Sequence, residues 1–301
     1  MMTNFDQIRR EAKAKGAKRL VVAPVTAATD LSTLSAAMAD GLVFPILVGD
    51  GKAASSWLGR EKIPAAHLEV IDEPDGGKAL ALAIDMVKKG AAEILLRGDM
   101  APGPFLGSVL DRETGLLKER VASLVSVFDP PAVNQVTMAT DTYVNSFPSI
   151  VEKVTITENV IKLAGVLGFA SPKIVALSAI EQVNPAIPST MDAAILSKMA
   201  ERRQFGDVTL EGPLDIDCAV SRRAATRKGV QSAVTGQGDI YLMPNVEAGL
   251  LMAELSVFIG KTPMACALMG VSRPVVLSLP FVPAENRLTE IALAVLLCGR
   301  L

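Results

Sequence analysis

Two strand-turn-helix units follow one another in Asp207-Val208-Thr209-Leu210-Glu211-Gly212-Pro213 and Asp239-Ile240-Tyr241-Leu242-Met243-Pro244-Asn245. The first run alternates like a strand, and Gly212 with the proline after it predicts its end, because proline cannot donate to a sheet ladder. A helix is expected next, capped by Asp215 and ended by Gly229. The second run predicts a buried strand, and Asn245 predicts the cap of an amphipathic helix closed by Gly260. In an open parallel sheet such turns lie at the carboxyl edge, where ligands bind.

The chain before residue 97 alternates between strand and helix patterns. Strands are predicted at 20–23, 44–48, 68–71 and 93–96, with helices at 31–39 and 77–88. This alternation predicts a parallel sheet covered on both faces. The rhythm then changes, because strands at 121–128 and 135–139 are joined by a linker too short for a helical crossover. These two strands are expected to be antiparallel neighbours. After them, Ser149 and Glu152 predict a capping box for a long helix that ends at about residue 167, and Ser189 predicts the cap of a helix at 190–203.

Composition excludes several classes of function. With 301 residues, 50% of them apolar, the chain can form two packed α/β lobes or one large one. Lysine and arginine total 30 against 32 for aspartate and glutamate, without a block of like charge, so nothing indicates nucleic acid or an anionic membrane. No apolar run approaches the about 18 residues of a membrane span, and the charged first residues predict a cytoplasmic protein. Cys218, Cys266 and Cys298 lack paired spacing and are expected to be buried.

The sequence argues against the common cofactor and nucleophile sites. The sequence has a single histidine, His67, which argues against histidine-based triads and most zinc sites. His67 is expected to be a surface or structural residue. The loop Gly236-Gln237-Gly238 lacks the third glycine of a dinucleotide fingerprint, and no P-loop lysine motif occurs. We therefore predict no metal and no bound cofactor.

Longer motifs are specific enough to indicate a family. They are Leu210-Glu211-Gly212-Pro213-Leu214-Asp215-Ile216-Asp217, Pro244-Asn245-Val246-Glu247-Ala248-Gly249, Glu181-Gln182-Val183-Asn184-Pro185 and Pro188-Ser189-Thr190-Met191-Asp192. These motifs resemble the phosphate acetyl/butyryltransferases, the butyryl branch more closely, and the likeness extends from about Asp75 to the C-terminus. The resemblance implies the exchange of acyl-CoA and phosphate for acyl phosphate and CoA, with CoA thioester as a substrate and a homodimer as the assembly.

The resemblance also implies the fold. We expect an α/β protein of two lobes, each a mostly parallel sheet flanked by helices, as in isocitrate and isopropylmalate dehydrogenases, with a cleft between them. The final helix returns to the first lobe in the related enzymes. The predicted domains are therefore 1–147 plus 284–301, and 148–283.

Candidate substrate-binding residues follow from the chemistry and from the resemblance. Arginine pairs bidentately with phosphate, which favours Arg97 and Arg120 as phosphate-binding residues, together with Gly98 after Arg97. Related enzymes usually have lysine at position 97, and a surface ion pair is an equal alternative for Arg97. Asp141 matches a family Thr-Asp pair, although a turn role is equally expected. The remaining candidates are Ser123, Thr142, Asn145, Gly236 and Asn245.

One departure from the family pattern concerns the catalytic residues. Where butyryl enzymes read Thr-Ser-Arg, this chain has Ser278-Leu279-Pro280, and Asn286 falls at the place of their aspartate base. Ser278 and Asn286 are thus the catalytic candidates. Loss of one transition-state donor costs ~3 kcal/mol, so weakened or shifted transferase activity is expected. The alternative is a non-catalytic CoA-binding or regulatory homologue. A metal-dependent dehydrogenase or decarboxylase of the two-lobed hydroxyacid type is a third interpretation, for which the necessary aspartates are not found.

Overall fold

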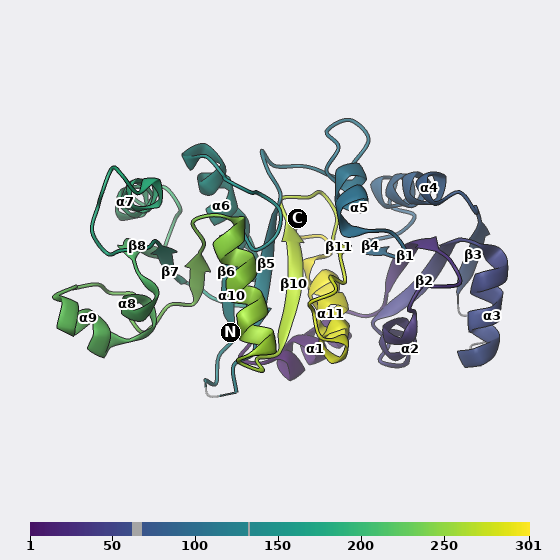
Figure 1. The fold of residues 1–301 in the computed structure, drawn as a ribbon. Helices are drawn as coiled ribbons and strands as arrows, with labels where there is room; N and C mark the ends of the chain where they lie inside the picture. The colour runs from purple at the N-terminus through teal and green to yellow at the C-terminus, as the bar shows by residue number, and fades with distance from the viewer. Residues whose placement is uncertain (62–67, 132) are drawn as a thin grey trace. The chain divides into compact units, whose positions relative to one another are not determined.

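The structure is a computed structural model that describes residues 1–61, 68–131 and 133–301 (Figure 1). His67 lies outside the described residues. The chain forms two compact units: the first comprises Phe5–Glu119 and Met264–Leu301, and the second comprises Met1–Asn4 and Arg120–Pro263. The domain limits expected from the sequence, at 147/148 and 283/284, stay a prediction.

The first unit contains a sheet of five parallel strands in the order β11-β4-β1-β2-β3. Their bounds are β1 Lys18–Val25, β2 Val43–Gly49, β3 Glu69–Asp72, β4 Ile94–Arg97 and β11 Val275–Val276. Six consecutive residues of β1 are buried, as expected for a parallel strand covered on both faces. The strands predicted in this region are confirmed, and the carboxyl ends of β1, β4 and β11 lie at one edge of the sheet.

Helices of the first unit pack against these strands. They are α1 Phe5–Ala14, α2 Ser32–Ala39, α3 Gly51–Glu61, α4 Gly76–Lys88, α5 Pro102–Val109 and α11 Arg287–Leu297, preceded by the 3-10 turn Ala284–Asn286. α4 covers β1 and β2, whereas α11 packs against β10 (Met264–Met269), β11 and α1. We did not predict α5, whose sequence contains two prolines and two glycines; burial of Phe105, Leu106 and Val109 compensates for poor helix propensity.

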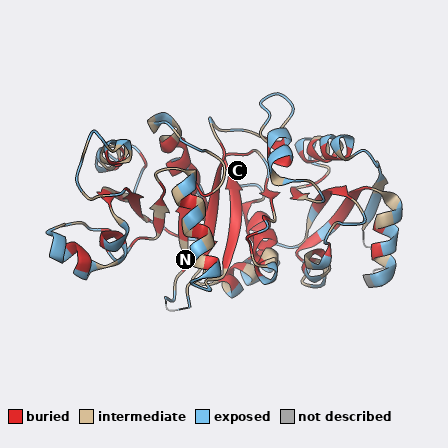
Figure 2. Cartoon of the chain, in the orientation of Figure 1, coloured by how far each residue is buried: buried red, intermediate tan, exposed pale blue. Residues whose placement is uncertain are grey.

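In the second unit, the strands follow the order β5-β6-β9-β7-β8. Their bounds are β5 Ser123–Phe128, β6 Thr137–Thr140, β7 Lys173–Leu177, β8 Thr209–Leu214 and β9 Ile240–Leu242. β5 and β6 are antiparallel, as the short linker predicts, and the other pairs are parallel. Figure 2 shows this interior, in which every residue of β5 is buried.

The helices of the second unit start mostly where the sequence predicts. They are α6 Ile150–Val166, α7 Pro188–Glu201, α8 Ile216–Val220, α9 Arg222–Lys228 and α10 Val246–Phe258. The capping box of Ser149 and Glu152 starts α6, and the Asn245 side chain caps α10 by accepting the Ala248 amide at 2.9 Å. Gly229 adopts the left-handed conformation expected after α9.

Three local predictions were wrong. β8 continues through Gly212 and Pro213, because β8 is the last strand of its sheet and an edge strand tolerates proline. The helix expected after Asp215 is divided at Ser221, which caps α9. Ser189 does not cap α7, which begins at Pro188, a proline suited to the first helical turn.

The apolar stripe of α10 does not face the interior of its own unit. Leu251, Leu255 and Phe258 are more than half exposed, and the buried residues are the small Gly249 and Ala253 with Val257. Cys218 and Cys266 are buried as expected, but Cys298 is half-buried. None of the described helices is long and apolar enough to cross a membrane.

Candidate functional site

Arg97, at the end of β4, bonds three carbonyl oxygens on two segments of the first unit. Its guanidinium donates from Nε to the carbonyl oxygen of Leu277 at 2.6 Å, from Nη2 to that of Ser278 at 2.6 Å, and from Nη1 to that of Met100. Each charged hydrogen bond of this kind contributes about 1.5–3 kcal/mol. Arg97 therefore fixes the chain as it leaves β11, and its contact with phosphate stays a prediction.

Ser278 lies just beyond β11 in a backbone conformation that few residues adopt. Its φ is 44°, in the left-handed region that favours glycine, and its side chain is half-buried. Leu279 is fully buried, and Pro280 is exposed. The two positions where the resemblance expects serine and arginine therefore hold a core leucine and a ring without a donor.

A buried carboxyl group, Glu290 on α11, adjoins this segment. Its Oε1 accepts the Cys266 amide at 3.1 Å, and its Oε2 has no hydrogen-bond partner among the described residues. Burial raises the pKa of Glu290 to about 8, although the Cys266 amide, the charges of Arg287 and Arg97 and the Ser278 hydroxyl all lower it. Glu290 is therefore largely protonated at neutral pH, unlike an ordinary glutamate.

The structure places Gly98 and Asn286 near the same edge by chain connection. Gly98 follows β4 where a Cβ would lie 2.0 Å from the Pro24 carbonyl oxygen, so the β1 and β4 ends approach closely only with glycine. Asn286 is buried at the start of α11, and its amide donates to the Pro283 carbonyl at 2.9 Å. Its predicted role as a base replacement is not tested by these contacts.

In the second unit, Asp141 organises the loop after β6. Its Oδ1 accepts the amides of Leu124, Tyr143 and Val144 at 2.9–3.1 Å, and its Oδ2 accepts the amide and side chain of Asn145. Burial raises the pKa of Asp141 against the opposing effect of these donors. These hydrogen bonds show that Asp141 stabilises the turn after β6. A substrate contact of Asp141 or Asn145 stays a prediction.

Ser123 and Thr142 are fully buried beside this loop. The Ser123 hydroxyl accepts the Asn159 side chain at 3.1 Å, and the Thr142 hydroxyl is 2.9 Å from that of Ser126. Arg120 is exposed, and its charge adds to the Ser149 hydrogen bonds that lower the pKa of Glu152. Four candidates therefore lie close together at the ends of β5 and β6: Ser123, Asp141, Thr142 and Asn145.

Gly236 and Asn245 lie on other turns of the second unit. Gly236 is exposed with a φ of 65°, and its amide donates to the Ala219 carbonyl at 2.8 Å. Next to the Asn245 turn, at the carboxyl ends of β7, β8 and β9, lies a cavity of about 670 Å³. Its lining is mostly apolar and includes Leu177, Met243, Leu251, Met252 and Leu255.

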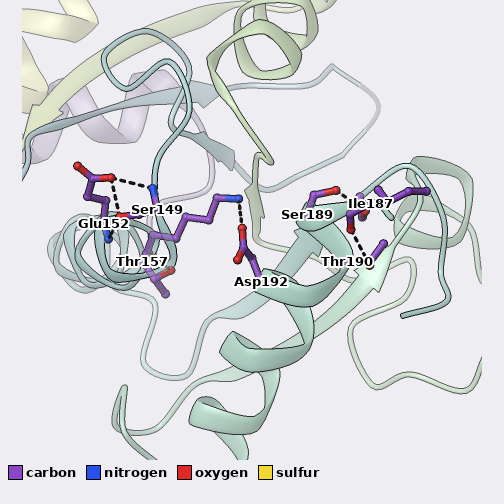
Figure 3. A network of polar contacts seen from close by, with 9 residues as sticks. Ser149, Glu152, Thr157, Ile187, Ser189, Thr190 and Asp192 are labelled. Carbon is purple, nitrogen blue, oxygen red and sulfur yellow. Dashed lines mark hydrogen bonds and ion pairs between the residues drawn. The ribbon is translucent and has the colours of Figure 1, made fainter. Parts of the chain in front are cut away.

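A buried ion pair joins α6 to α7 (Figure 3). Lys153 on α6 is 5% exposed, and its ammonium lies 2.7 Å from the Asp192 carboxylate on α7. The Ser189 hydroxyl of α7 lies 2.7 Å from that of Ser178, which lines the cavity. The pair thus holds the start of α7 in place at the carboxyl edge of the sheet.

One group in the described part of the chain could offer three metal ligands. Asp215, Asp217 and Cys218 place their ligand atoms within 4.8 Å of one another. The Lys228 ammonium already bonds both carboxylates. Burial raises the pKa of Asp215, but hydrogen bonds from Lys228 and Cys218 outweigh it and lower the pKa to about 2. Burial raises the pKa of Cys218 to about 12, so a cation already occupies the carboxylates and no thiolate is offered.

Sequence comparison decides the family. The family described as "Phosphate acetyl/butaryl transferase" matches residues 50–295. The phosphate butyryltransferase of Clostridium acetobutylicum is 35% identical over 299 residues, 99% of each chain. The chain belongs to the phosphate acetyl/butyryltransferase family. The phosphate acetyltransferase of Thermotoga maritima is 32% identical, over 96% of this chain and 98% of that protein.

Solved structures of this acyltransferase family share the fold. A branched-chain phosphotransacylase from Enterococcus faecalis superposes with a TM-score of 0.81 at 23% identity, covering 94% of this chain and 99% of that one. A phosphotransacetylase from Streptococcus pyogenes gives a TM-score of 0.82 at 18% identity, covering 97% and 98%. The predicted α/β fold class is therefore confirmed.

Glu290 was not among the candidate residues predicted from the sequence. It lies in the segment 289–297, in which every residue is buried and all but the first two are apolar. An acidic residue inside such a run is a usable signal, because a buried carboxyl is costly unless it has a partner or a function. Arg97 was predicted as a candidate, but two of its three carbonyl partners, Leu277 and Ser278, lie 180 and 181 residues away in the sequence, and no sequence pattern identifies them.

Proposed function

We propose that this protein transfers a short acyl group between CoA and inorganic phosphate. The observation that carries the proposal is membership of the acyltransferase family along nearly the whole chain. The group formed by Arg97, Ser278 and Glu290 supplies charge, a hydroxyl and a protonated carboxyl at a sheet edge where ligands commonly bind. The proposed reaction requires no cofactor, since positioning and charge stabilisation suffice for acyl transfer between bound partners.

Thiol release tests this proposal. We expect release of CoA from acetyl-CoA or butyryl-CoA that depends on phosphate, with the product trapped by hydroxylamine as the hydroxamate. Because leucine and proline occupy the positions of the Ser-Arg pair, we expect a rate ~10²-fold below that of a relative retaining the pair. Binding of CoA without turnover of either thioester would instead support the non-catalytic homologue. The cytoplasmic location stays a prediction, which cell fractionation would test.

We also propose that two copies associate through α10. Five large apolar side chains on α8 and α10 are more than half exposed: Ile216, Val220, Leu251, Leu255 and Phe258. Ile216, Leu251 and Leu255 line the same cavity and so belong to one exposed apolar surface, and a large surface of this kind marks a protein contact. A homodimer would cover this face.

Light scattering on purified protein measures the association. We expect the wild type to have the mass of a dimer and Leu251→Asp/Leu255→Asp to have that of a monomer, because two carboxylates would be desolvated at the contact. Arg223→Asp, an exposed residue of α9, is the matched control and should leave the mass unchanged. A monomeric wild type, or an unchanged mass in the double variant, would overturn this assembly.

A further inference from the structure

Glu290 is a buried acid that the family pattern does not explain. It is 1% exposed, and Oε2 is buried without a partner among the described residues. A carboxyl oxygen in this state is costly and requires an explanation. The half-buried Ser278 side chain acts on this carboxyl, and the Ser278 carbonyl oxygen is held at 2.6 Å by Arg97, whose charge also acts on Glu290.

We propose that Glu290 is a positioning residue that exchanges the proton of the acyl transfer through the Ser278 hydroxyl. The inference rests on the proposed function. In this proposal the proton moves between Ser278 and Glu290. This path takes the place of the aspartate base that related enzymes have at the position of Asn286.

The step is balanced in atoms and charge. An oxygen of monohydrogen phosphate bonds to the thioester carbon, and the carbon–sulfur bond breaks. The leaving sulfur takes the Ser278 hydroxyl proton, while the Glu290 carboxylic acid gives its own proton to the Ser278 oxygen. The proton that the phosphate loses on becoming acyl phosphate restores the acid. In the reverse direction the Glu290 carboxylate accepts the thiol proton by the same route.

The surroundings of Glu290 suit this exchange. Three groups act on its carboxyl: Arg287 from the same helix, Arg97 from β4, and the backbone amide of Cys266 from β10. Arg287 is paired with Asp30, and Arg9 of α1 contacts the neighbouring Thr289 at 3.3 Å. The pKa of Glu290, raised to about 8 by burial, is close to the about 8.5 of a free thiol, which favours transfer in both directions.

The pH dependence of thiol release tests the inference. With acyl-CoA and saturating phosphate, the wild type should be active below about pH 8 and lose activity above it, because the carboxylate has no proton to give. Glu290→Gln should lower kcat about 100-fold and abolish the alkaline loss. Glu290→Asp should restore part of the rate. Glu11→Gln, an exposed acid of α1, is the control and should match the wild type.

A second variant keeps the test decisive. Ser278→Ala should lower kcat to a similar extent, and combining it with Glu290→Gln should add little, because the two residues act as a unit. Glu290→Gln with wild-type rate and an unchanged alkaline limb would overturn the inference while leaving the proposed function intact. Wild-type rate in Ser278→Ala would do the same even if Glu290→Gln does not fold. An inactive wild type would overturn both.

Discussion

Arg97→Ala is expected to reduce phosphate-dependent thiol release at least 100-fold. The guanidinium holds three carbonyl oxygens, two of them on the segment that carries Ser278. Without those bonds, the left-handed φ of 44° at Ser278 loses its support, and the hydroxyl moves from its place. A displacement of about 1 Å commonly costs 10²-fold in rate, which corresponds to about 2.7 kcal/mol.

Arg97→Lys separates positioning from simple charge. A lysine keeps the positive charge, but the three N–H donors of its ammonium share one nitrogen and cannot reproduce the spread, planar fork that reaches these three carbonyl oxygens. We therefore expect Arg97→Lys to lose most of the rate through kcat, with little change in the KM for phosphate. A variant with wild-type kcat and a raised KM for phosphate would show that Arg97 binds the anion directly, as the sequence analysis predicts.

Lys153→Met is expected to lower the free energy of unfolding by about 3 kcal/mol. Removal of one partner of a buried ion pair leaves an uncompensated charge, which commonly costs 3–5 kcal/mol. The lower end applies because the Asp192 side chain is 23% exposed and regains some water. Urea unfolding followed by circular dichroism measures the change.

The double variant Lys153→Met/Asp192→Leu is the matched control. With both charges removed, an apolar contact between α6 and α7 should restore most of the stability, since a buried pair is seldom better than packed apolar groups. If the single variant were as stable as the wild type, the pair would contribute nothing to holding α7. Equal losses in the single and double variants would indicate a packing defect instead.

The features that the sequence predicts well are those set by neighbouring residues. The Ser149 and Glu152 capping box, the Asn245 cap and the left-handed Gly229 all depend on side chains within a few positions. The antiparallel β5-β6 pair follows from a short linker in the same way. These elements are determined by residues close together in the sequence and need no tertiary contact to be predicted.

Features that depend on distant residues could not be predicted. Whether β8 tolerates Pro213 depends on β8 being the last strand of its sheet, which is a property of the whole unit. The apolar residues of α10 predict a buried stripe, yet the side of α10 that faces its unit is the one with Gly249. A Cβ at Gly249 would lie 2.3 Å from the Asp141 carbonyl oxygen, so this side packs closely against the loop after β6. The raised pKa of Glu290 likewise arises from burial of α11, which packs against α1, β10 and β11, and the sequence around α11 does not reveal these contacts.

In the reaction that we propose, phosphate, and not water, attacks the CoA thioester. The most direct measurement supplies butyryl-CoA with phosphate labelled by ¹⁸O in all four positions and determines the mass of the acyl product. We expect butyryl phosphate that retains all four labelled oxygens, formed at the same rate as free CoA. Free CoA accompanied only by unlabelled butyrate, or no CoA release at all, would contradict it.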